Sequence, residues 1–240
     1  MNGAFLNALG ILLGALAGLI RRTPLAPRAQ FFLRTVLGVA TIFAGIRLVE
    51  ESLGVGFGTG MKRLLIALVA VVLGFWLGKL MRLQKLSNFL GRQAGRLIAN
   101  ARQNPPGRPV AGLTACVLLF GAAPLGWLGA AEDGFTGQCY LLAVKALMDA
   151  LAMLGFVAIF GWPAALSAFP IFCLLGAVTW GVQKMAAPFC MAHHVADSVT
   201  AATGVVACAV SLVIFEVRKV ELANFLPAMA VAPVLEWLWR

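Results

Sequence analysis

The stretch CYLLAVKALMDALAMLGFVAIFGW, residues 139–162, decides the fold class, because it is apolar enough to cross a membrane and its only charges are Lys145 and Asp149. A helix of about 20 apolar residues spans the hydrocarbon core of a bilayer. On such a helix the two charged residues, four positions apart, lie on one face and can pair. An ionisable side chain at the centre of a span costs roughly 2.5–3.5 kcal/mol on insertion scales. We therefore expect the pair to face protein or water, and it is the first candidate for a functional site.

The composition of the whole chain indicates a protein that is mostly dissolved in lipid. Of the 240 residues, 61% are hydrophobic and 12% are charged, and the mean hydropathy is +0.93, whereas a soluble domain has about 25% charged residues. The net charge of +10 would suggest nucleic acid as a partner of a soluble protein. Here the cations cluster at the ends of apolar runs, so membrane topology explains them and no nucleic-acid partner is expected. The five cysteines are scattered, and no disulfide framework or CxxC site follows from them.

The apolar runs predict an all-α, polytopic integral membrane protein with seven or eight transmembrane helices in a single membrane domain, residues 1–240. The first run lacks a basic leader and a small-residue cleavage pattern, so we expect it to be a retained span. The fifth run begins at Cys139 and contains the charged pair. The other expected spans are residues 3–20, 32–49, 64–80, 110–130, 164–187, 199–215 and 222–238.

The basic residues predict the orientation of these spans. Thirteen of the 19 Lys and Arg residues follow the first, third and seventh spans: Arg21, Arg22, Arg28, Arg34, Lys79, Arg82, Lys85, Arg92, Arg96, Arg102, Arg108, Arg218 and Lys219. Alternation of eight spans puts these three loops on one face, which is cytoplasmic by the positive-inside rule. Glu50, Glu51, Glu132, Asp133 and Asp197 fall in the opposite loops. Both termini are then expected on the external side of the membrane.

The basic linker of residues 81–109 has the pattern of an amphipathic helix. Its apolar residues fall near one helical face, and its cations fall between them. Such a helix lies in the membrane interface, here on the inner leaflet; the alternative is a solvated cytoplasmic connector. The prolines of Asn104-Pro105-Pro106-Gly107 are expected to end it.

Two apolar segments suggest an internal repeat. GVATIFAGIRLVE (38–50) and GVVACAVSLVIFE (204–216) share glycine, valine and glutamate at the same offsets. Their spans would run in opposite directions, so spans one to three would match spans six to eight as an inverted repeat. Inverted repeats are common in transporters; chance similarity between apolar segments is the alternative.

Small residues repeat every four positions in two spans and are expected to mediate helix packing. Gly10, Gly14 and Gly18 form one stripe, and Gly74 and Gly78 form a second. Such stripes let another helix backbone approach closely, either within one chain or between copies in a homo-oligomer.

Polar residues in apolar surroundings are the candidates for chemistry. The Asn7 amide needs a partner inside the membrane, either another helix or a solute. The pair Lys145–Asp149 is either a neutral structural link or a site that contacts a solute, an ion or a proton. Glu132-Asp133-Gly134 is either a cation-attracting external entrance or an acidic turn whose glycine permits the bend.

The segment Cys190-x-x-His193-His194-x-x-Asp197 carries side chains that can bind metal. This order does not match a closed zinc site, so we expect an ordinary loop and no metal. The run Asn224-Phe225-Leu226-Pro227 marks either a broken helix or a kink that serves packing. No GxSxG, HExxH or phosphate-binding loop is present, so neither an enzyme nor a cofactor is expected.

Several segments resemble one known family. They are FLNALGILLGALAG (5–18), GAAPLGWLGAAEDGFTGQ (121–138), KALMDAL (145–151) and VELANFLPAMAVAP (220–233). Together they resemble the uncharacterised bacterial inner-membrane family of domain of unknown function 554, the YqgA-like proteins, over nearly the whole chain. The matching polar positions are Asn7, Glu132, Asp133, Gly134, Lys145, Asp149, Asn224 and Pro227. Leu174-Leu175-Gly176 departs from the family, in which a Gln is expected in this span.

The resemblance implies a polytopic membrane protein, often described as a transporter, without an established substrate. We therefore predict a secondary transporter or channel for a small polar solute or ion, with Lys145 and Asp149 at its centre. Asn7 and Asn224 are expected to add polar contacts. No ATP-binding motif is present, so transport would be ion-coupled or passive. The alternative is a structural or assembly membrane protein without transport activity.

Overall fold

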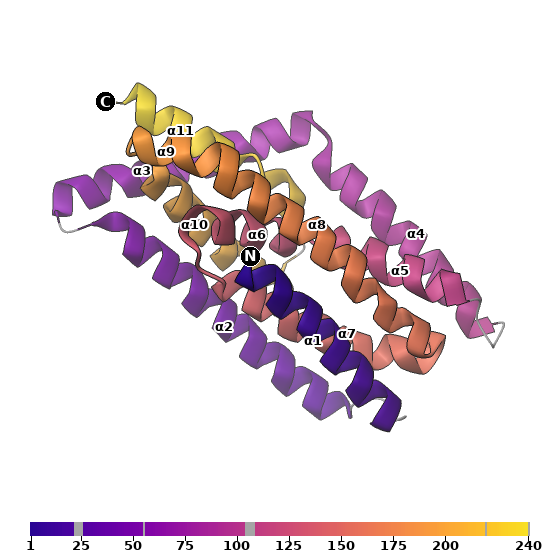
Figure 1. Ribbon diagram of the computed structural model, residues 1–240. Coiled ribbons are helices and arrows are strands. Elements are labelled where there is room, and N and C mark those ends of the chain that lie inside the picture. The colour runs from indigo at the N-terminus through magenta and orange to yellow at the C-terminus, as the bar shows by residue number, and fades with distance from the viewer. Residues whose placement is uncertain (22–25, 55, 104–108, 219, 240) are drawn as a thin grey trace.

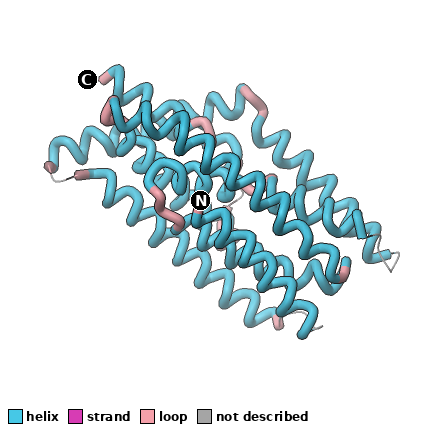
Figure 2. Tube along the Cα trace, viewed as in Figure 1, coloured by secondary structure: helices cyan, strands magenta, loops and turns pink. Residues whose placement is uncertain are grey.

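The computed structural model describes residues 1–21, 26–54, 56–103, 109–218 and 220–239, and within these ranges the chain is helical, without strands (Figure 1, Figure 2). The first half contains α1 (Asn2–Arg21), α2 (Pro27–Leu53), α3 (Phe57–Leu80), α4 (Leu83–Gln103) and α5 (Pro109–Gly121). The second half contains α6 (Pro124–Thr136), α7 (Tyr140–Phe160), η1 (Trp162–Ser167), α8 (Ala168–Gly181), η2 (Val182–Ala186), α9 (Ala187–Ala192), α10 (Ala196–Ile214), η3 (Leu222–Phe225) and α11 (Ala228–Leu238). The expected stop at residues 104–107 lies outside the described residues.

Six helical segments in the described chain are long and apolar enough to cross a membrane: α1, α2, α3, α7, the run from η1 to α9, and α10. A seventh span results if α5 and α6 are counted together, although they are bent by 62°. The segment Leu222–Leu238, expected as an eighth span, is a shorter apolar helix that is interrupted at Leu226–Pro227. The polytopic all-α class is therefore confirmed. The last expected span falls short of full length because its first turns, η3, are 3-10 helix and not part of α11.

Helices α1 and α7 pack side by side, with the glycine stripe of α1 on the backbone of α7. Gly10, Gly14 and Gly18 meet successive turns of α7 in the same order, so the two helices run in the same direction. A Cβ atom on Gly10 would lie 2.6 Å from the carbonyl oxygen of Ala146, and one on Gly14 would overlap the backbone of Ala150. Only glycine permits this approach. The stripe therefore serves packing within one chain.

Helices α2 and α10 pack against each other in opposite directions. Gly45 lies against Gly204 at the crossing, where a Cβ on Gly204 would lie 2.6 Å from the carbonyl oxygen of Gly45. Gly38, earlier in α2, faces Phe215 just after α10. Val49, later in α2, contacts Gly204. The two similar segments thus run in opposite directions and contact each other. The match of all three spans on either side remains a prediction.

The second glycine stripe brings α3 against the last helical segment of the chain. Gly74 lies on the backbone of Ala228, and Gly78 lies on that of Asn224. This pair therefore also packs within one chain, which leaves the expected homo-oligomer without support from the glycine stripes.

The half-helix α6 lies in the centre of the bundle and corrects one expectation. Glu132, Asp133 and Gly134 were expected in an acidic turn after a span ending at Ala130. Instead they belong to α6, and the side chains of Glu132 and Asp133 are buried. The chain breaks earlier, at residues 122–123, so the second half of this span enters the protein interior at an angle. Protein packs around α6 from α1, α7, α8 and α10, and the carboxylates need not leave the membrane as they would on a lipid-exposed span.

Helix α4 forms in the basic linker and packs along α5. Ala94 and Ala101 are buried, whereas Leu86 and Phe89 are exposed. Part of its apolar face is therefore used inside the protein. An interfacial position for the exposed part remains a prediction.

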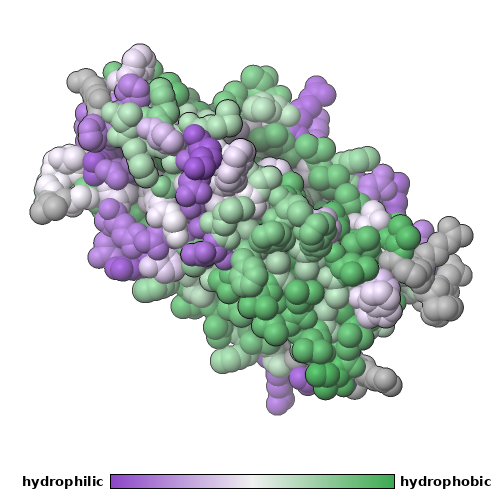
Figure 3. Space-filling view, viewed as in Figure 1, coloured by the Kyte–Doolittle hydropathy of each residue, from purple (hydrophilic) through white to green (hydrophobic). Residues whose placement is uncertain are grey.

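The molecular surface is divided between an apolar girdle and polar ends. Figure 3 shows a broad hydrophobic area over α1, to which Phe5, Leu9, Leu12, Leu13 and Leu16 contribute exposed side chains. Hydrophilic residues gather toward the end where α2 leads into α3 (Figure 3). Large exposed apolar residues of this kind are expected where lipid is the solvent.

Candidate functional site

Lys145 and Asp149 form a buried ion pair on α7, as the sequence predicted. Both lie on one face of the helix, and Lys145 Nζ contacts Asp149 Oδ2 directly. Their relative exposures are 1% and 6%, so water does not solvate either charge. A pair of this kind is stable only when each charge keeps its partner and further hydrogen bonds support it.

Asn7 supplies such a hydrogen bond from α1. Its Nδ2 donates to Asp149 Oδ2 at 2.9 Å, across 142 positions of sequence. The close glycine packing of α1 on α7 sets this distance. Asn7 is fully buried, and its Oδ1 has no hydrogen-bond partner among the described residues. One acceptor oxygen beside the ion pair is therefore left without a donor among the residues that the structure describes.

The break between α5 and α6 shapes the other side of the lysine. Lys145 Nζ lies 5.7 Å from the centre of the Phe120 ring, on α5. A Cβ on Gly126 of α6 would lie 2.6 Å from Lys145 Cε, so glycine makes room for the lysine stem. Sequence analysis singled out neither Phe120 nor Gly126. The bend between α5 and α6 brings these two residues to Lys145. A span read from the sequence as one continuous helix gives no indication of that contact.

A cavity of about 610 Å³ opens beside this centre. Its walls come from α2, α6, α7, α10 and the segment after α10, and they are mostly apolar. Arg34 and Glu216 form an ion pair at its polar edge. Its lining includes Leu125 and Met148, which adjoin Gly126 and Asp149 in sequence. Lys145 and Asp149 are not part of the lining, so the cavity does not open onto the pair.

Glu132 lies on another face of α6 and has a different environment. Its Oε1 accepts hydrogen bonds from Thr136 at 3.1 Å and from Thr200 of α10 at 3.2 Å. Its Oε2 is buried without a hydrogen-bond partner among the described residues. Glu132 was predicted from the sequence as part of an entrance, but nothing in the sequence pointed to the threonines of α10, because hydroxyls are common in membrane helices.

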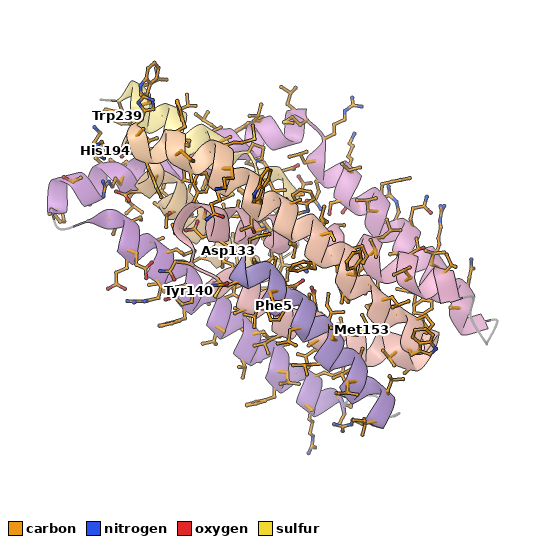
Figure 4. All side chains as sticks on the ribbon, viewed as in Figure 1. Phe5, Asp133, Tyr140, Met153, His194 and Trp239 are labelled. Carbon is orange, nitrogen blue, oxygen red and sulfur yellow. The ribbon has the colours of Figure 1, made fainter. Side chains whose placement is uncertain are left out.

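Asp133 and Gly134 join α6 to its neighbours. Asp133 Oδ2 accepts a hydrogen bond from the backbone N–H of Gly3 and pairs with the amino group of Met1, each at 3.2 Å. Figure 4 shows Asp133 beside the start of α1. A Cβ on Gly134 would lie 2.7 Å from the carbonyl oxygen of Thr179, so this glycine permits contact with α8. These two residues therefore pack helices, and the interpretation of the whole motif as an open entrance does not fit their burial.

Asn224 does not join the central pair. Its Oδ1 accepts from the backbone N–H of Gln84 at 3.1 Å, and its Nδ2 donates to Glu221 Oε2 at 2.7 Å. Gln84 Oε1 in turn accepts from the backbone N–H of Ala223 at 3.1 Å. These bonds tie η3 to the first turn of α4, where backbone N–H groups need an acceptor. Asn224 thus caps the start of α4 and lies away from Lys145.

The weak metal candidates do not converge. The His193 ring packs on Phe189 with centroids 4.5 Å apart, and Asp197 pairs with Arg63 of α3. Figure 4 shows His194 and Trp239 near the C-terminal end of the molecule. In the part of the chain that the structure describes, no three His, Cys, Asp or Glu side chains could share a metal ion, and the five cysteines are free thiols.

Comparison with known proteins gives one family and two curated relatives. A family model described as "Protein of unknown function (DUF554)" matches residues 2–237. The chain is 25% identical over 238 residues to "Uncharacterized protein YqgA" of Escherichia coli (strain K12), which covers 99% of this chain and 97% of the relative. It is 23% identical over 235 residues to "Uncharacterized membrane protein YdfK" of Bacillus subtilis (strain 168), with 98% and 95% covered. No solved structure matches the chain. The long apolar helices and the second relative's name both indicate a membrane location.

Proposed function

The chain belongs to the DUF554 family of proteins of unknown function, and we propose that it is a secondary transporter or channel for a small polar solute that carries an anionic group. The basic loops would face the cytoplasm of a bacterial inner membrane. The protein would act without enzymatic turnover and without a cofactor. The family resemblance predicted from sequence is confirmed, and the transport activity is our proposal.

The observation that carries this proposal is the buried group of Lys145, Asp149 and Asn7. Lys145 is the only one of the three that is a cation, and it would bind a carboxylate or similar anion of the solute. Asp149 neutralises the lysine when no solute is present. The spare Oδ1 of Asn7 would accept a hydrogen bond from a donor on the solute. A buried polar atom without a partner is uncommon and calls for an explanation.

The broken span supports the same interpretation. Discontinuous helices in transporters place backbone ends and half-helix dipoles at the substrate site. Here α6 begins at Pro124, two residues before the glycine that contacts Lys145. The positive end of a helix and a lysine at one place favour an anionic group. The neighbouring cavity has Arg34 and Glu216 at its edge and does not reach the pair in this conformation, so a solute would need a further opening between α6 and α7.

A structural or assembly role is the second candidate, because one specific observation favours it. Lys145 and Asp149 contact each other directly and do not line the cavity. In that case the pair would only hold α7 in register with its surroundings, and no solute would compete for it.

A binding screen on the purified protein separates these two functions. The melting temperature of the detergent-purified chain is measured against ions and central metabolites, since a ligand at 100 times its Kd adds about 2.7 kcal/mol of stability. The transporter proposal expects a hit that disappears in Lys145→Ala and persists in Arg47→Ala, whose exposed pairs with Glu50 and Glu51 lie elsewhere.

The reversed pair, Lys145→Asp with Asp149→Lys, gives the opposite test. A solute site loses its ligand in this variant, although an ion pair can form again. If the reversed protein binds and transports as the original does, the proposed site is wrong. If no compound stabilises the original protein while Lys145→Ala lowers its melting temperature, the structural role is favoured.

A further inference from the structure

The carboxyl group of Glu132 is a second buried polar centre, separate from the ion pair on α7. It is 1% exposed and contacts α10, whereas Lys145 contacts α5 and α6 at Phe120 and Gly126. Residues 126 and 132 are about 9 Å apart along α6 at 1.5 Å per residue. The two centres can therefore be perturbed independently.

From this arrangement we propose that Glu132, Thr200 and Thr203 form a binding site for a small monovalent cation, for which Na⁺ is the probe. This inference does not depend on the proposed transport function, because it concerns cation binding alone.

The charge of Glu132 favours a bound cation. No Lys, Arg or His of the described residues forms an ion pair with Glu132. A buried carboxylate without a partner is strongly unfavourable, and Glu51 of α2 adds a further negative charge to its surroundings. One carboxylate matches one positive charge. A divalent ion would leave an excess charge in the interior.

The oxygen atoms around the carboxylate also favour a bound cation. Thr200 and Thr136 lie within hydrogen-bonding distance of Oε1, and Thr203 also interacts with the carboxyl group. Thr203 also donates its hydroxyl proton to the carbonyl oxygen of Val199 at 2.9 Å, and its oxygen keeps lone pairs that a cation can use. A carboxylate oxygen without a donor, such as Oε2, and hydroxyl oxygens with free lone pairs are the ligands of a hard cation.

The site also has a short route to water. Thr136 lies one helical turn beyond Glu132, and both Thr136 and Gly137 are exposed at the end of α6. A cation that sheds its water there would pass one hydroxyl before reaching the carboxylate. The apolar helix before Glu132 closes the other direction.

The test is a sodium titration of the detergent-purified full chain, with choline chloride keeping the ionic strength constant at one fixed pH. The melting temperature and the binding of radioactive sodium are both measured. We expect Na⁺ to raise the melting temperature and choline to leave it unchanged. Glu132→Gln should abolish both signals, and Thr200→Val or Thr203→Val should weaken the apparent affinity by about tenfold or more, as loss of a coordinating or supporting group does.

Thr179→Val is the matched control. Thr179 is a buried threonine of α8 whose hydroxyl donates to the carbonyl oxygen of Ala130 at 3.0 Å and not to the carboxyl group of Glu132. This variant should keep the sodium response even if its melting temperature falls. If Glu132→Gln cannot be purified, the two threonine variants and sodium binding to the original chain decide the outcome.

Three results would overturn the site. Equal melting curves in Na⁺ and choline, without bound radioactive sodium, would mean that no cation binds. A sodium response that survives in Glu132→Gln would place the ion elsewhere. A dependence on pH that requires Glu132 but does not change with Na⁺ would mean that a proton alone neutralises the carboxylate.

Discussion

Removing one charge from the pair on α7 should destabilise the protein far more than removing both. In Asp149→Asn the Lys145 ammonium loses the one ion-pair partner it has among the described residues, while the substituted side chain keeps its size. The amide that replaces the carboxylate can still accept the hydrogen bond from Asn7. The variant therefore isolates the loss of charge from the loss of packing.

The expected magnitude follows from the surroundings of the lysine. Breaking a buried ion pair by removing one partner costs about 3–5 kcal/mol. What remains near Lys145 is the Phe120 ring at 5.7 Å, and such a contact contributes about 0.5–2 kcal/mol. We expect Asp149→Asn to lower the free energy of unfolding by about 3 kcal/mol, at the lower end of the range. In the double variant with Lys145→Met no charge is left, so stability should return to within about 1 kcal/mol of the original.

The assay is reversible unfolding in mixed detergent micelles, applied to the original chain, both single variants and the double variant. The four free energies close a double-mutant cycle, which yields the coupling energy of the pair. Arg47→Ala is the matched control. Its pairs with Glu50 and Glu51 are exposed, so it should change stability by about 1 kcal/mol or less.

The cycle can contradict this reasoning in two ways. If Asp149→Asn is as stable as the original, the lysine has another partner or solvent, and the pair is not buried as described. If the double variant is as unstable as the single one, then packing or the Asn7 bond accounts for the loss, and charge does not. If the double variant regains stability but does not bind the ligand, the result agrees with a solute site at the pair.

Three further predictions concern packing, capping and topology. Gly14→Leu should prevent recovery of folded protein, because any side chain at this position overlaps the α7 backbone. Gly95→Ala on α4, with open space around it, should instead stabilise the chain by about 0.5–1 kcal/mol. The yield of folded protein and its melting temperature check both expectations. Asn224→Ala should cost about 1–3 kcal/mol and speed hydrogen exchange at the start of α4 without changing the response to ligand, and an altered ligand response would return Asn224 to the site. Cysteines placed at Arg92 and Glu50 should react with an impermeant reagent only from the cytoplasmic and the external side, respectively; labelling of both from one side would refute the orientation.

The sequence alone was enough to establish the membrane class, the helical content and the pairing of Lys145 with Asp149. These features are local. Apolar runs select helices because the bilayer provides no partner for backbone N–H and C=O groups, and two residues four apart share a helical face whatever surrounds them.

The number and course of the spans could be predicted only in part. Hydropathy placed the end of the fourth span before Glu132, because charged residues are expected to leave the lipid. The helix instead breaks at residues 122–123 and continues as α6, with Glu132 and Asp133 buried. A hydropathy profile cannot distinguish lipid from surrounding protein, and this distinction decides where a charge is tolerated.

Only the tertiary structure decided which polar residues meet. Asn7 reaches Asp149 across 142 positions, whereas Asn224, grouped with them by its type, caps α4 elsewhere. Thr200 reaches Glu132 from α10 without any motif to announce it. Such contacts depend on how closely two helices approach and at which register, and for Asn7 and Asp149 the glycines of α1 set both. The chain thus determines by itself that it crosses a membrane with charges inside, while packing at these glycines determines which side chains share a centre.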